Sequence, residues 1–469
     1  MAVREFIGRE AELAAIEREL ARARPSLLVI LGRRRVGKSR LLLEAAAKRP
    51  TIYYQATKIA GSTSLEFFKQ AAADIIGSDP VLAGLSDWYS TLAYIHRAAP
   101  RFPGLTVIFD EFPYLCDVDS SLPSVVQKFW DEAQAADGNF NLILCGSKIA
   151  YMEALLAEKN PLHGRQNLRL DVAPLSYRET ARFFPAWSTE DRLRAFAVFG
   201  GIPFYLNLVD PGIGLDANIL DLVLEKGAPL ADEPDTLLQA ELRDVTRYAT
   251  ILHAIADGCT KSGDIIGRVR EFPNAGALGT YVEKLAELRL IRIVRSLDAT
   301  EKERDRRYYL DDPFLKFWFH FCLPHLSALA SGHAGEVLRL AILPNFDAYM
   351  GDLFEWICRE HARRYLPEIL PVPARVIGQI WAADYDIDVA GSLLDGSVVF
   401  GECKWWKDPV GENILDRLVE RAEKTAYGRG EARRHYLLYA RSGFTQDLSR
   451  RADRSPSIRL VSPDALLGP

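Results

Sequence analysis

This 469-residue sequence lacks the features that mark a membrane or secreted protein. It has no uninterrupted apolar run of about 18 residues, the length that a membrane-spanning helix needs. Its start shows no signal-peptide pattern of a basic segment followed by an apolar one. We therefore expect a cytoplasmic protein with no membrane partner.

Cysteine is scarce and scattered, which argues against a disulfide scaffold and against a zinc site. No two cysteines form a C-x-x-C pair, and most of them stand among apolar residues. Free thiols buried in a reducing compartment fit this distribution best. The six positions are Cys116, Cys145, Cys259, Cys322, Cys358 and Cys403.

The sequence also lacks an excess of basic residues. Its formal net charge is -5, so any binding of nucleic acid has to come from a local patch. No repeat with a period of about 20–50 residues is present, which excludes a solenoid. A hydrophobic content of 48% and a charged content of 26% are typical of a globular protein. The length predicts about three domains.

The most specific motif is GRRRVGKS, residues 32–39, which fits the phosphate-binding pattern G-x-x-x-x-G-K-[ST]. The apolar run at 27–31 predicts a buried strand before it, and residues 39–47 predict a helix after it. A glycine loop between a strand and a helix N-terminus directs backbone N–H groups at phosphates. Lys38 would reach the β- and γ-phosphates, and the Ser39 hydroxyl would bind Mg²⁺. The sequence therefore predicts a site for a nucleoside triphosphate.

Acidic residues end another apolar segment, at 105–109. Asp110 would stand beside the Mg²⁺, and Glu111 would polarise the attacking water as general base. A third apolar segment, at 141–145, leads to Ser147, which would sense the γ-phosphate, although Gly-Ser is also ordinary turn chemistry. The expected nucleotide contacts are Gly32, Arg35, Val36, Gly37, Lys38, Ser39, Arg40, Asp110 and Ser147.

Periodicity divides the chain into several parts. Alternating strand and helix patterns predict an α/β nucleotide-binding core at 1–175, followed by a helical lid at 176–245. Residues 246–312 predict three short helices and two strands, the outline of a winged helix-turn-helix. Residues 313–340 connect this part to a small α/β domain at 341–469. Their aromatic stripe predicts a packing helix that joins domains, and the Gly-containing stretch 329–336 predicts a flexible joint.

The third of the short helices, which starts at Asn274, would face a DNA groove. It carries Tyr281 and Lys284, and a charged loop at 302–307 joins the two strands that follow. Winged helices also serve as protein-docking modules, so this pattern leaves DNA and protein open as partners.

A second group of charged residues lies in the C-terminal part. Asp386 and Asp388 alternate with apolar residues, so they share one face of an expected strand. After a turn, Glu402 and Lys404 share a face of a second strand. Two carboxylates would hold Mg²⁺, and Lys404 would steady the attacking water or the pentacovalent phosphate.

Glu355 is the third acid that we expect near this metal. It stands on an expected helix at 347–363, which would pack across the face that carries Asp388, Glu402 and Lys404. The same residues would equally form surface ion pairs on a charged hairpin, because Glu-x-Lys by itself is a common pattern.

In order along the chain, these motifs resemble those of known families. FIGRE, GRRRVGKS, VIFDEF, LCGS and GGIPFYL, followed by a winged helix, resemble archaeal and bacterial P-loop ATPases of the AAA+/STAND-related group. DPFLKFWF, GDLFEWICRE, DIDVA and GECKW resemble the nuclease-like domain often fused to them, which is similar to the PD-(D/E)xK fold of restriction endonucleases and Holliday-junction resolvases. Relatives with a Glu-Ile-Asp strand differ here, where Asp386 takes the place of that Glu.

The resemblance implies an α/β fold with a P-loop AAA+-like ATPase core, a helical lid, a winged helix-turn-helix and a C-terminal restriction-endonuclease-like α/β domain. It supports the ATP residues Lys38, Ser39, Asp110, Glu111 and Ser147, and the nuclease residues Glu355, Asp388, Glu402 and Lys404. Related ATPases also carry an arginine after a Pro-Leu-x-Gly turn, as Arg165 does here. Arg165 would be an arginine finger acting on a neighbour in a homo-oligomer, or would equally brace its own loop.

These expectations combine into an ATP-dependent DNA-processing protein with ATP and Mg²⁺ as cofactors. ATP binding and hydrolysis would move the lid and the winged helix, and so control access of DNA to a Mg²⁺-dependent endonuclease. The alternative is a nucleotide-gated switch that binds DNA or protein, in which the nuclease-like domain only grips nucleic acid.

Overall fold

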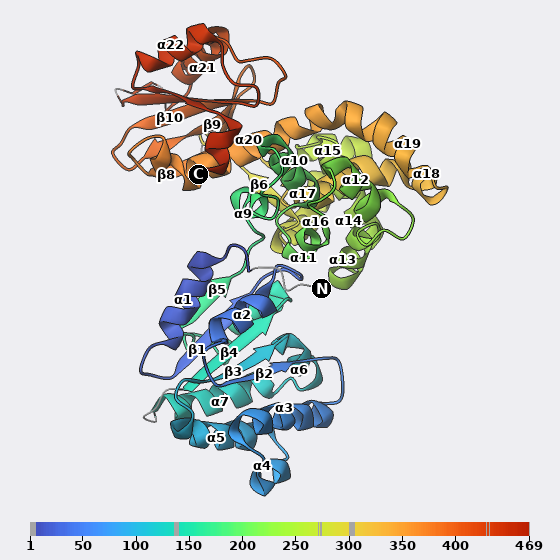
Figure 1. Ribbon diagram of the computed structural model, residues 1–469, viewed down its shortest axis with the longest axis vertical. Coiled ribbons are helices and arrows are strands. Elements are labelled where there is room, and N and C mark those ends of the chain that lie inside the picture. The colour runs from blue at the N-terminus through green and yellow to red at the C-terminus, as the bar shows by residue number, and fades with distance from the viewer. Residues whose placement is uncertain are drawn as a thin grey trace. The chain divides into compact units, whose positions relative to one another are not determined.

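The computed structural model describes residues 6–135, 140–270, 272, 274–299, 305–427, 429–430 and 432–468. They form two compact units, seen in Figure 1. The first contains the residues up to Leu175 and, from further along the chain, Ile202–Phe204. The second contains Ser176–Gly201 and the residues from Tyr205 onward. The short segment Ile202–Phe204 is therefore part of the first unit although the residues on both sides of it belong to the second.

A five-stranded parallel sheet forms the centre of the first unit, in the order β2-β3-β4-β1-β5. Strands β1, β3 and β4 are buried along their whole length, as apolar strands of a parallel sheet are. Because β4 lies between β1 and β3, the carboxyl ends of all three open on one edge. The strands are β1 (Ser26–Leu31), β2 (Thr51–Gln55), β3 (Leu105–Asp110), β4 (Phe140–Gly146) and β5 (Leu168–Asp171).

The helices of the first unit connect these strands and cover the sheet. Phe68, Leu92 and Trp130, from three different helices, pack with Val107 and Leu142 of the sheet in one apolar core. The expected α/β core with a parallel sheet is confirmed. The helices are α1 (Glu10–Leu20), α2 (Lys38–Ala46), α3 (Gly61–Ile76), α4 (Pro80–Gly84), α5 (Trp88–Ala98), α6 (Phe112–Val118), α7 (Leu122–Ala135) and α8 (Ile149–Leu155).

The second unit begins with a group of short helices. A capping box starts α9, because Ser176 accepts from the backbone N–H of Glu179 and the Glu179 side chain accepts from the backbone N–H of Ser176. Helix α10 ends before Gly200, whose φ of 64° suits glycine. The helices are α9 (Tyr177–Ala181), α10 (Thr189–Phe199), α11 (Pro203–Leu208), α12 (Leu215–Ile219) and α13 (Glu233–Glu241), with a π-helical turn at Leu220–Leu224.

Three helices and a two-stranded antiparallel sheet follow, where the sequence predicts them. Asn274 caps the third helix by accepting from the backbone N–H of Ala277 at 3.0 Å. Of the expected charged loop, residues 302–304 lie outside the described residues. The elements are α14 (Val245–Ala256), α15 (Ser262–Val269), α16 (Ala275–Glu287), β6 (Ile291–Val294) and β7 (Arg307–Leu310).

Helices also make up the connection to the C-terminal domain. The rings of Phe314, Phe317, Trp318, Phe319 and Phe321 are buried, so this aromatic stripe packs within the unit, as we expected. Residues 329–336, expected to be a flexible joint, instead form a helical hairpin in which a turn at 331–333 joins α18 to α19. The helices are α17 (Pro313–Phe317), α18 (Leu326–Ala330), α19 (Ala334–Val337) and α20 (Phe346–Arg364), with π-helical turns at Trp318–Cys322 and Leu338–Ile342.

The C-terminal domain has a mixed five-stranded sheet in the order β12-β11-β10-β9-β8. Strands β8, β9 and β10 are antiparallel neighbours, and β10, β11 and β12 are parallel. Its elements are β8 (Ala374–Trp381), β9 (Asp386–Leu393), β10 (Val398–Lys404), α21 (Glu412–Lys424), β11 (Arg434–Ala440), α22 (Gln446–Asp453), β12 (Ile458–Val461) and α23 (Pro463–Leu467).

Helices α20 and α21 lie on opposite faces of this sheet. Leu415 and Leu418 of α21 share an apolar core with Val398 and Phe400, on the face that also carries Glu402 and Lys404. Cys403 points the other way, and its thiol interacts with that of Cys358 in α20. We expected α20 to pack across the Glu402 face, and this prediction is wrong. The small, apolar Cys403 side chain belongs to the face that α20 buries.

The segment after β6 packs along the outer strand β8. The backbone N–H of Leu297 donates to the carbonyl oxygen of Gln379 at 3.0 Å, and the backbone N–H of Trp381 donates to Ser296 Oγ at 3.1 Å. The Arg307 guanidinium lies 4.2 Å from the centre of the Trp381 ring. The β6–β7 hairpin therefore packs directly against strand β8 of the C-terminal domain.

Candidate functional sites

The phosphate-binding loop lies between β1 and α2. Gly37 caps α2 with a φ of 90°, and Arg35 also has a positive φ, of 66°. A Cβ atom on Gly32 would lie 2.3 Å from the carbonyl oxygen of Val172, so only glycine fits there. Lys38 Nζ donates to the carbonyl oxygens of Gly32 and Arg33 at 2.8 and 2.9 Å. The loop thus curls around the Lys38 ammonium, as a phosphate cradle requires.

Asp110 lies at the end of β3, next to this loop. Its Oδ2 accepts hydrogen bonds from Ser39 Oγ and Tyr53 Oη, both at 2.5 Å, and its Oδ1 accepts from the backbone N–H of Glu111 at 3.0 Å. Burial, followed by the hydrogen bond to Asp110, raises the pKa of Tyr53 well above its usual range. Three donors therefore fix a buried carboxylate beside the serine that we expect to bind Mg²⁺.

Glu111 and Ser147 meet across the ends of β3 and β4. Ser147 donates to Glu111 Oε2 twice, from its backbone N–H at 3.0 Å and from its hydroxyl at 2.8 Å. Glu111 has a φ of 55°, a strained value for a residue with a side chain. The general base that we expect is therefore held by the residue that we expect to sense the γ-phosphate.

Other residues of the loop have distinct surroundings. Val36 is buried, and its carbonyl oxygen accepts from the guanidinium of buried Arg9 at 3.0 Å. The Arg35 guanidinium lies 4.5 Å from the centre of the Phe204 ring. Arg40, expected to contact nucleotide, is exposed and donates to Glu44 at 3.1 Å.

Arg9 and Tyr53 support this site but were not predicted. Arg9 stands in the FIGRE motif. Its backbone is in the left-handed region, with a φ of 67°, which the sequence alone does not reveal. Tyr53 reaches Asp110 because β2 and β3 are neighbours in the sheet, a non-local pairing that the sequence does not reveal.

Arg165 is paired within its own chain. Its Nε and Nη2 donate to the two carboxylate oxygens of Asp131 in α7, at 2.6 and 2.9 Å, and its Nη1 donates to the carbonyl oxygen of His163. A bidentate arginine–carboxylate pair fixes the guanidinium plane. This geometry favours the interpretation in which Arg165 braces its own loop.

The second candidate site lies at the end of the β9–β10 hairpin. Lys404 Nζ is 2.7 Å from Glu402 Oε1 and 3.9 Å from Asp388 Oδ2. Asp388 Oδ2 also accepts from the backbone N–H of Cys403 at 2.8 Å. The hairpin therefore brings Asp388, Glu402 and Lys404 together, as alternation predicts.

The electrostatics of this site are dominated by burial and by like charges. Burial, and then the carboxylates of Glu355 and Glu402, raise the pKa of Asp388 well above its usual range. Burial alone would lower the pKa of Lys404, but Asp388 and Glu402 outweigh it, so this pKa is raised. An ammonium ion held by carboxylates is the net result.

Glu355 is close to this group but turned to another partner. Its carboxylate is 3.4 Å from the Arg359 guanidinium, which also donates to the carbonyl oxygen of Asp388 at 2.8 Å. Burial raises the pKa of Glu355. Within the described part of the chain, no three His, Cys, Asp or Glu side chains are grouped closely enough to hold a metal ion.

Arg421 is a member of this site that was not predicted. It projects from α21 and lies 3.4 Å from both carboxylate oxygens of Glu402, and it donates to the carbonyl oxygen of Asp386 at 3.1 Å. Asp386 itself is exposed. The high polarity of one face of α21 was visible in the sequence, but the face of the sheet that it covers was not.

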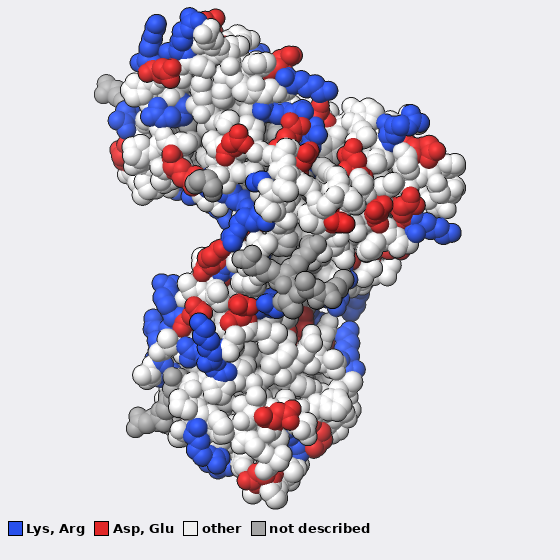
Figure 2. Space-filling view, in the orientation of Figure 1, with Lys and Arg blue, Asp and Glu red and all other residues white. Residues whose placement is uncertain are grey.

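Helix α16 does not present a basic face. Glu283 and Glu287 are exposed on it, and Lys284 is paired with Glu287 at 3.0 Å. Tyr281 packs its ring against Tyr248 and Phe272. Basic and acidic side chains are also interspersed over the face of each unit shown in Figure 2. The structure therefore offers no strong attraction for phosphates at this helix.

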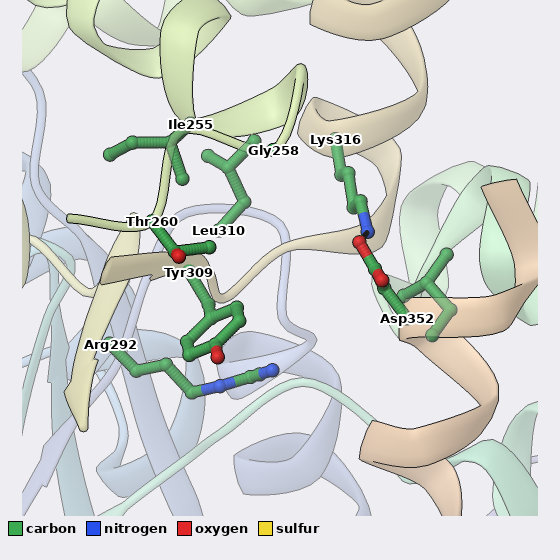
Figure 3. Close-up of a pocket in the computed structure, with 9 residues that line it drawn as sticks. Ile255, Gly258, Thr260, Arg292, Tyr309, Leu310, Lys316 and Asp352 are labelled. Carbon is green, nitrogen blue, oxygen red and sulfur yellow. Dashed lines mark hydrogen bonds and ion pairs between the residues drawn. The ribbon is translucent and has the colours of Figure 1, made fainter. Parts of the chain in front are cut away.

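A small pocket lies near β6, β7, α17 and α20 (Figure 3). Arg292 on its floor donates to Asp311 at 3.3 Å, and burial lowers its pKa. Lys316 and Asp352 point at each other across one side, 3.0 Å apart. Both cations of the pocket are thus neutralised by carboxylates of the protein.

Two families match different parts of the chain. Residues 6–209 match a family described as an ATPase domain predominantly from Archaea. Residues 318–420, which include Glu355, Asp388, Glu402 and Lys404, match a family of archaeal and bacterial proteins of unknown function. With its loop, parallel sheet and Asp110–Glu111 pair, the first unit is a nucleotide-binding P-loop ATPase domain.

Two relatives extend this comparison. An uncharacterized protein of Methanocaldococcus jannaschii is 29% identical over 432 residues, which are 90% of this chain and 91% of the relative. The Walker-type ATPase of Pyrococcus abyssi is 20% identical and aligns with a TM-score of 0.51, over 67% of this chain and 96% of that one. The similarity to the Walker-type ATPase concerns the fold.

Among the described residues, no helix combines the length and the apolar character needed to cross a membrane.

Proposed function

We propose that ATP binding and hydrolysis in the first unit control a Mg²⁺-dependent DNA endonuclease site in the second. The observation that carries this proposal is the position of Lys404, 2.7 Å from Glu402 and 3.9 Å from Asp388 at the end of the β9–β10 hairpin. The strand order and directions of the sheet, with a helix before β8 and another between β10 and β11, also support a restriction-endonuclease-like domain.

The donor chemistry of this site fits Mg²⁺. Asp388, Glu402 and Glu355 offer only oxygen ligands, which Mg²⁺ prefers, whereas zinc sites usually include His or Cys. Burial and mutual repulsion raise the pKa of Asp388, and a divalent cation would relieve that repulsion. When bound, the ion would lower the pKa of a bound water and polarise the phosphate.

The residues of the chain would divide the remaining work. Asp388 and Glu402 would hold the ion, with Glu355 as a third acid. Lys404 would orient the attacking water, or stabilise the negative charge that develops on the phosphate. Two further cations would attract the DNA backbone. Arg421 contacts Glu402, the partner of Lys404, and Lys407 follows Lys404 closely in the chain.

In the ATPase site, Lys38 and the loop would bind the phosphates, and Ser39 and Asp110 would hold Mg²⁺. Glu111 would act as base once Ser147 donates its hydrogen bonds to the γ-phosphate and no longer to Glu111. Residues 176–245, 246–312 and 313–340 would serve as lid, winged helix and connector. We place the DNA contact in the C-terminal domain, because α16 carries exposed Glu283 and Glu287.

One observation favours the alternative, a nucleotide-gated switch whose C-terminal domain only grips nucleic acid. Glu355 is engaged with Arg359, and the described residues contain no assembled group of three metal ligands. A gripping domain would use Lys404 as a cation without needing Asp388 and Glu402 as ligands.

Cleavage of a panel of linear, branched and single-stranded DNA with Mg²⁺, with and without ATP, separates the two functions. We expect Lys404→Ala to abolish cleavage and to keep most of the DNA affinity. Lys226→Ala, which removes an exposed lysine elsewhere in the second unit, is the control and should retain cleavage. Glu111→Gln should bind ATP but hydrolyse it about 100-fold more slowly, because an amide cannot accept the proton. Cleavage that survives Lys404→Ala, or that is the same in wild type and Glu111→Gln at every ATP concentration, would contradict the proposal.

A further inference from the structure

Two adjacent tryptophans follow β10, and they have opposite environments. Trp405 is only 5% exposed, with its ring 5.0 Å from Phe354 and 5.1 Å from the Arg441 guanidinium. Trp406 is 46% exposed. The backbone at Trp406 is fixed, because its carbonyl oxygen accepts from Ser442 Oγ at 2.7 Å. Trp406 thus presents a large apolar ring to solvent from an anchored position.

This exposed ring lies beside the second candidate site. Lys404 Nζ is 5.5 Å from the centre of the Trp406 ring and 2.7 Å from Glu402. The Lys407 side chain, which follows Trp406 in the chain, is 79% exposed, and its Nζ lies 3.5 Å from Asp347 Oδ2. Arg421 reaches Glu402 from α21. The Lys404 ammonium therefore lies over an exposed aromatic ring, and Lys407 follows that ring in the chain. An aromatic ring with a cation beside it suits a ligand that alternates phosphates with flat bases.

We infer that Trp406 is a base-stacking position and that the substrate is a nucleic acid with an unpaired base next to the phosphate held at Lys404. The inference rests on the proposed function for the identity of that phosphate. A base inside a continuous duplex is already stacked on both faces, whereas an unpaired base has a free face for an indole ring. The substrate class is therefore a single strand, a flap or a junction that carries unpaired bases, and not an intact duplex.

A structural role for Trp406 would be to shield the Lys404 ammonium by a cation–π contact. The two roles differ in what they demand of the ligand. A shield affects single-stranded and duplex DNA alike, because both bring the same phosphate. A stacking ring affects only a ligand that has an unpaired base at the right position.

Binding is measured with the full chain in EDTA, which prevents cleavage, by fluorescence anisotropy of labelled oligonucleotides. Stacking of one base contributes about 1–3 kcal/mol, so Trp406→Ala should weaken the binding of single-stranded DNA by about 5-fold or more. Binding of a blunt duplex should change less than about twofold, and Trp406→Phe should restore most of the affinity. The matched control is Leu394→Ala, which removes another exposed apolar side chain, 66% accessible, at the opposite end of the hairpin.

A second arm moves a single abasic site along the single-stranded oligonucleotide. Wild type should lose affinity when the missing base reaches one particular position, and Trp406→Ala should not respond to that position. Equal losses for single strand and duplex, no loss with Trp406→Ala, or no binding of nucleic acid by wild type would each overturn the inference. Binding that follows this pattern without any Mg²⁺-dependent cleavage would refute the endonuclease and leave the stacking position intact.

Discussion

The two candidate sites are held together in opposite ways. In the ATPase site, Asp110 accepts three hydrogen bonds and Glu111 accepts two, so each acid is stabilised by donors of the protein. In the C-terminal site, burial, and then the nearby carboxylates of Glu355 and Glu402, raise the pKa of Asp388. The first site is thus stable as it stands, whereas the second carries an electrostatic cost that a bound cation would remove.

The largest effect that we expect concerns the first site. Lys38→Ala should lower ATP affinity by about 100-fold, because a charge-assisted hydrogen bond to phosphate contributes up to about 3 kcal/mol. A fluorescent ATP analogue measures this, and Lys48→Ala, an exposed lysine just after α2, is the control. An affinity within twofold of wild type would mean that the loop does not bind phosphates through Lys38.

Acid should weaken the C-terminal domain. Burial lowers the pKa of His361 in α20 to about 4, below the value of about 6.5 in an unfolded chain. Between these values the unfolded state binds a proton that the folded state does not, so stability falls as the pH falls from about 6.5 to 4, by about 3 kcal/mol in total.

Hydrogen exchange of α20 and β11, corrected for intrinsic rates, measures this loss. His361→Gln should flatten the pH dependence, and exposed His333→Gln should leave it unchanged. A pH dependence that persists in His361→Gln would assign the acid sensitivity to other groups.

A matched pair of substitutions sharpens the comparison directly. Asp110→Asn should destabilise the nucleotide-free protein by about 1–2 kcal/mol, because an amide cannot accept from Ser39, Tyr53 and Glu111 as the carboxylate does. Asp388→Asn should stabilise the metal-free protein by about 1 kcal/mol, because it removes one of three like charges from a buried place. Urea unfolding in EDTA, followed in each unit, measures both. Changes of the same sign would break the contrast between the sites.

The smallest effect should come from Arg165. If the guanidinium only braces its loop against Asp131, Arg165→Ala should change ATP hydrolysis less than about threefold, and the rate per subunit should not depend on protein concentration. Asp131→Ala, which breaks the same ion pair, is the control and should match it. A drop of about 1000-fold in hydrolysis for Arg165→Ala alone would establish an arginine finger.

What the sequence predicts well is local. GRRRVGKS and the apolar runs before Asp110 and Ser147 define the ATPase site, because each motif is contiguous and follows a buried strand. Alternation likewise places Glu402 and Lys404 on one face. Partners from distant segments were not predictable: Tyr53 depends on the pairing of β2 with β3, and Arg421 depends on the face that α21 covers.

One error had a visible signal. Cys403 stands between Glu402 and Lys404, and a small apolar residue at that place indicates a buried opposite face. Helix α20 covers that face through Cys358. The prediction of a flexible joint at 329–336 was wrong for a different reason. Gly332, with a φ of 83°, forms a tight turn that closes a helical hairpin.

The hydrogen bonds that join Leu297 and Ser296 to β8 have a consequence for the behaviour of shortened chains. An outer strand with free backbone groups can template the addition of a strand from another molecule. Residues 296–297 cover part of the outer edge of β8. A fragment beginning after residue 312 would uncover it and should self-associate, whereas one that starts before α14 should not. We therefore expect the segment after β6 to protect the C-terminal domain from aggregation.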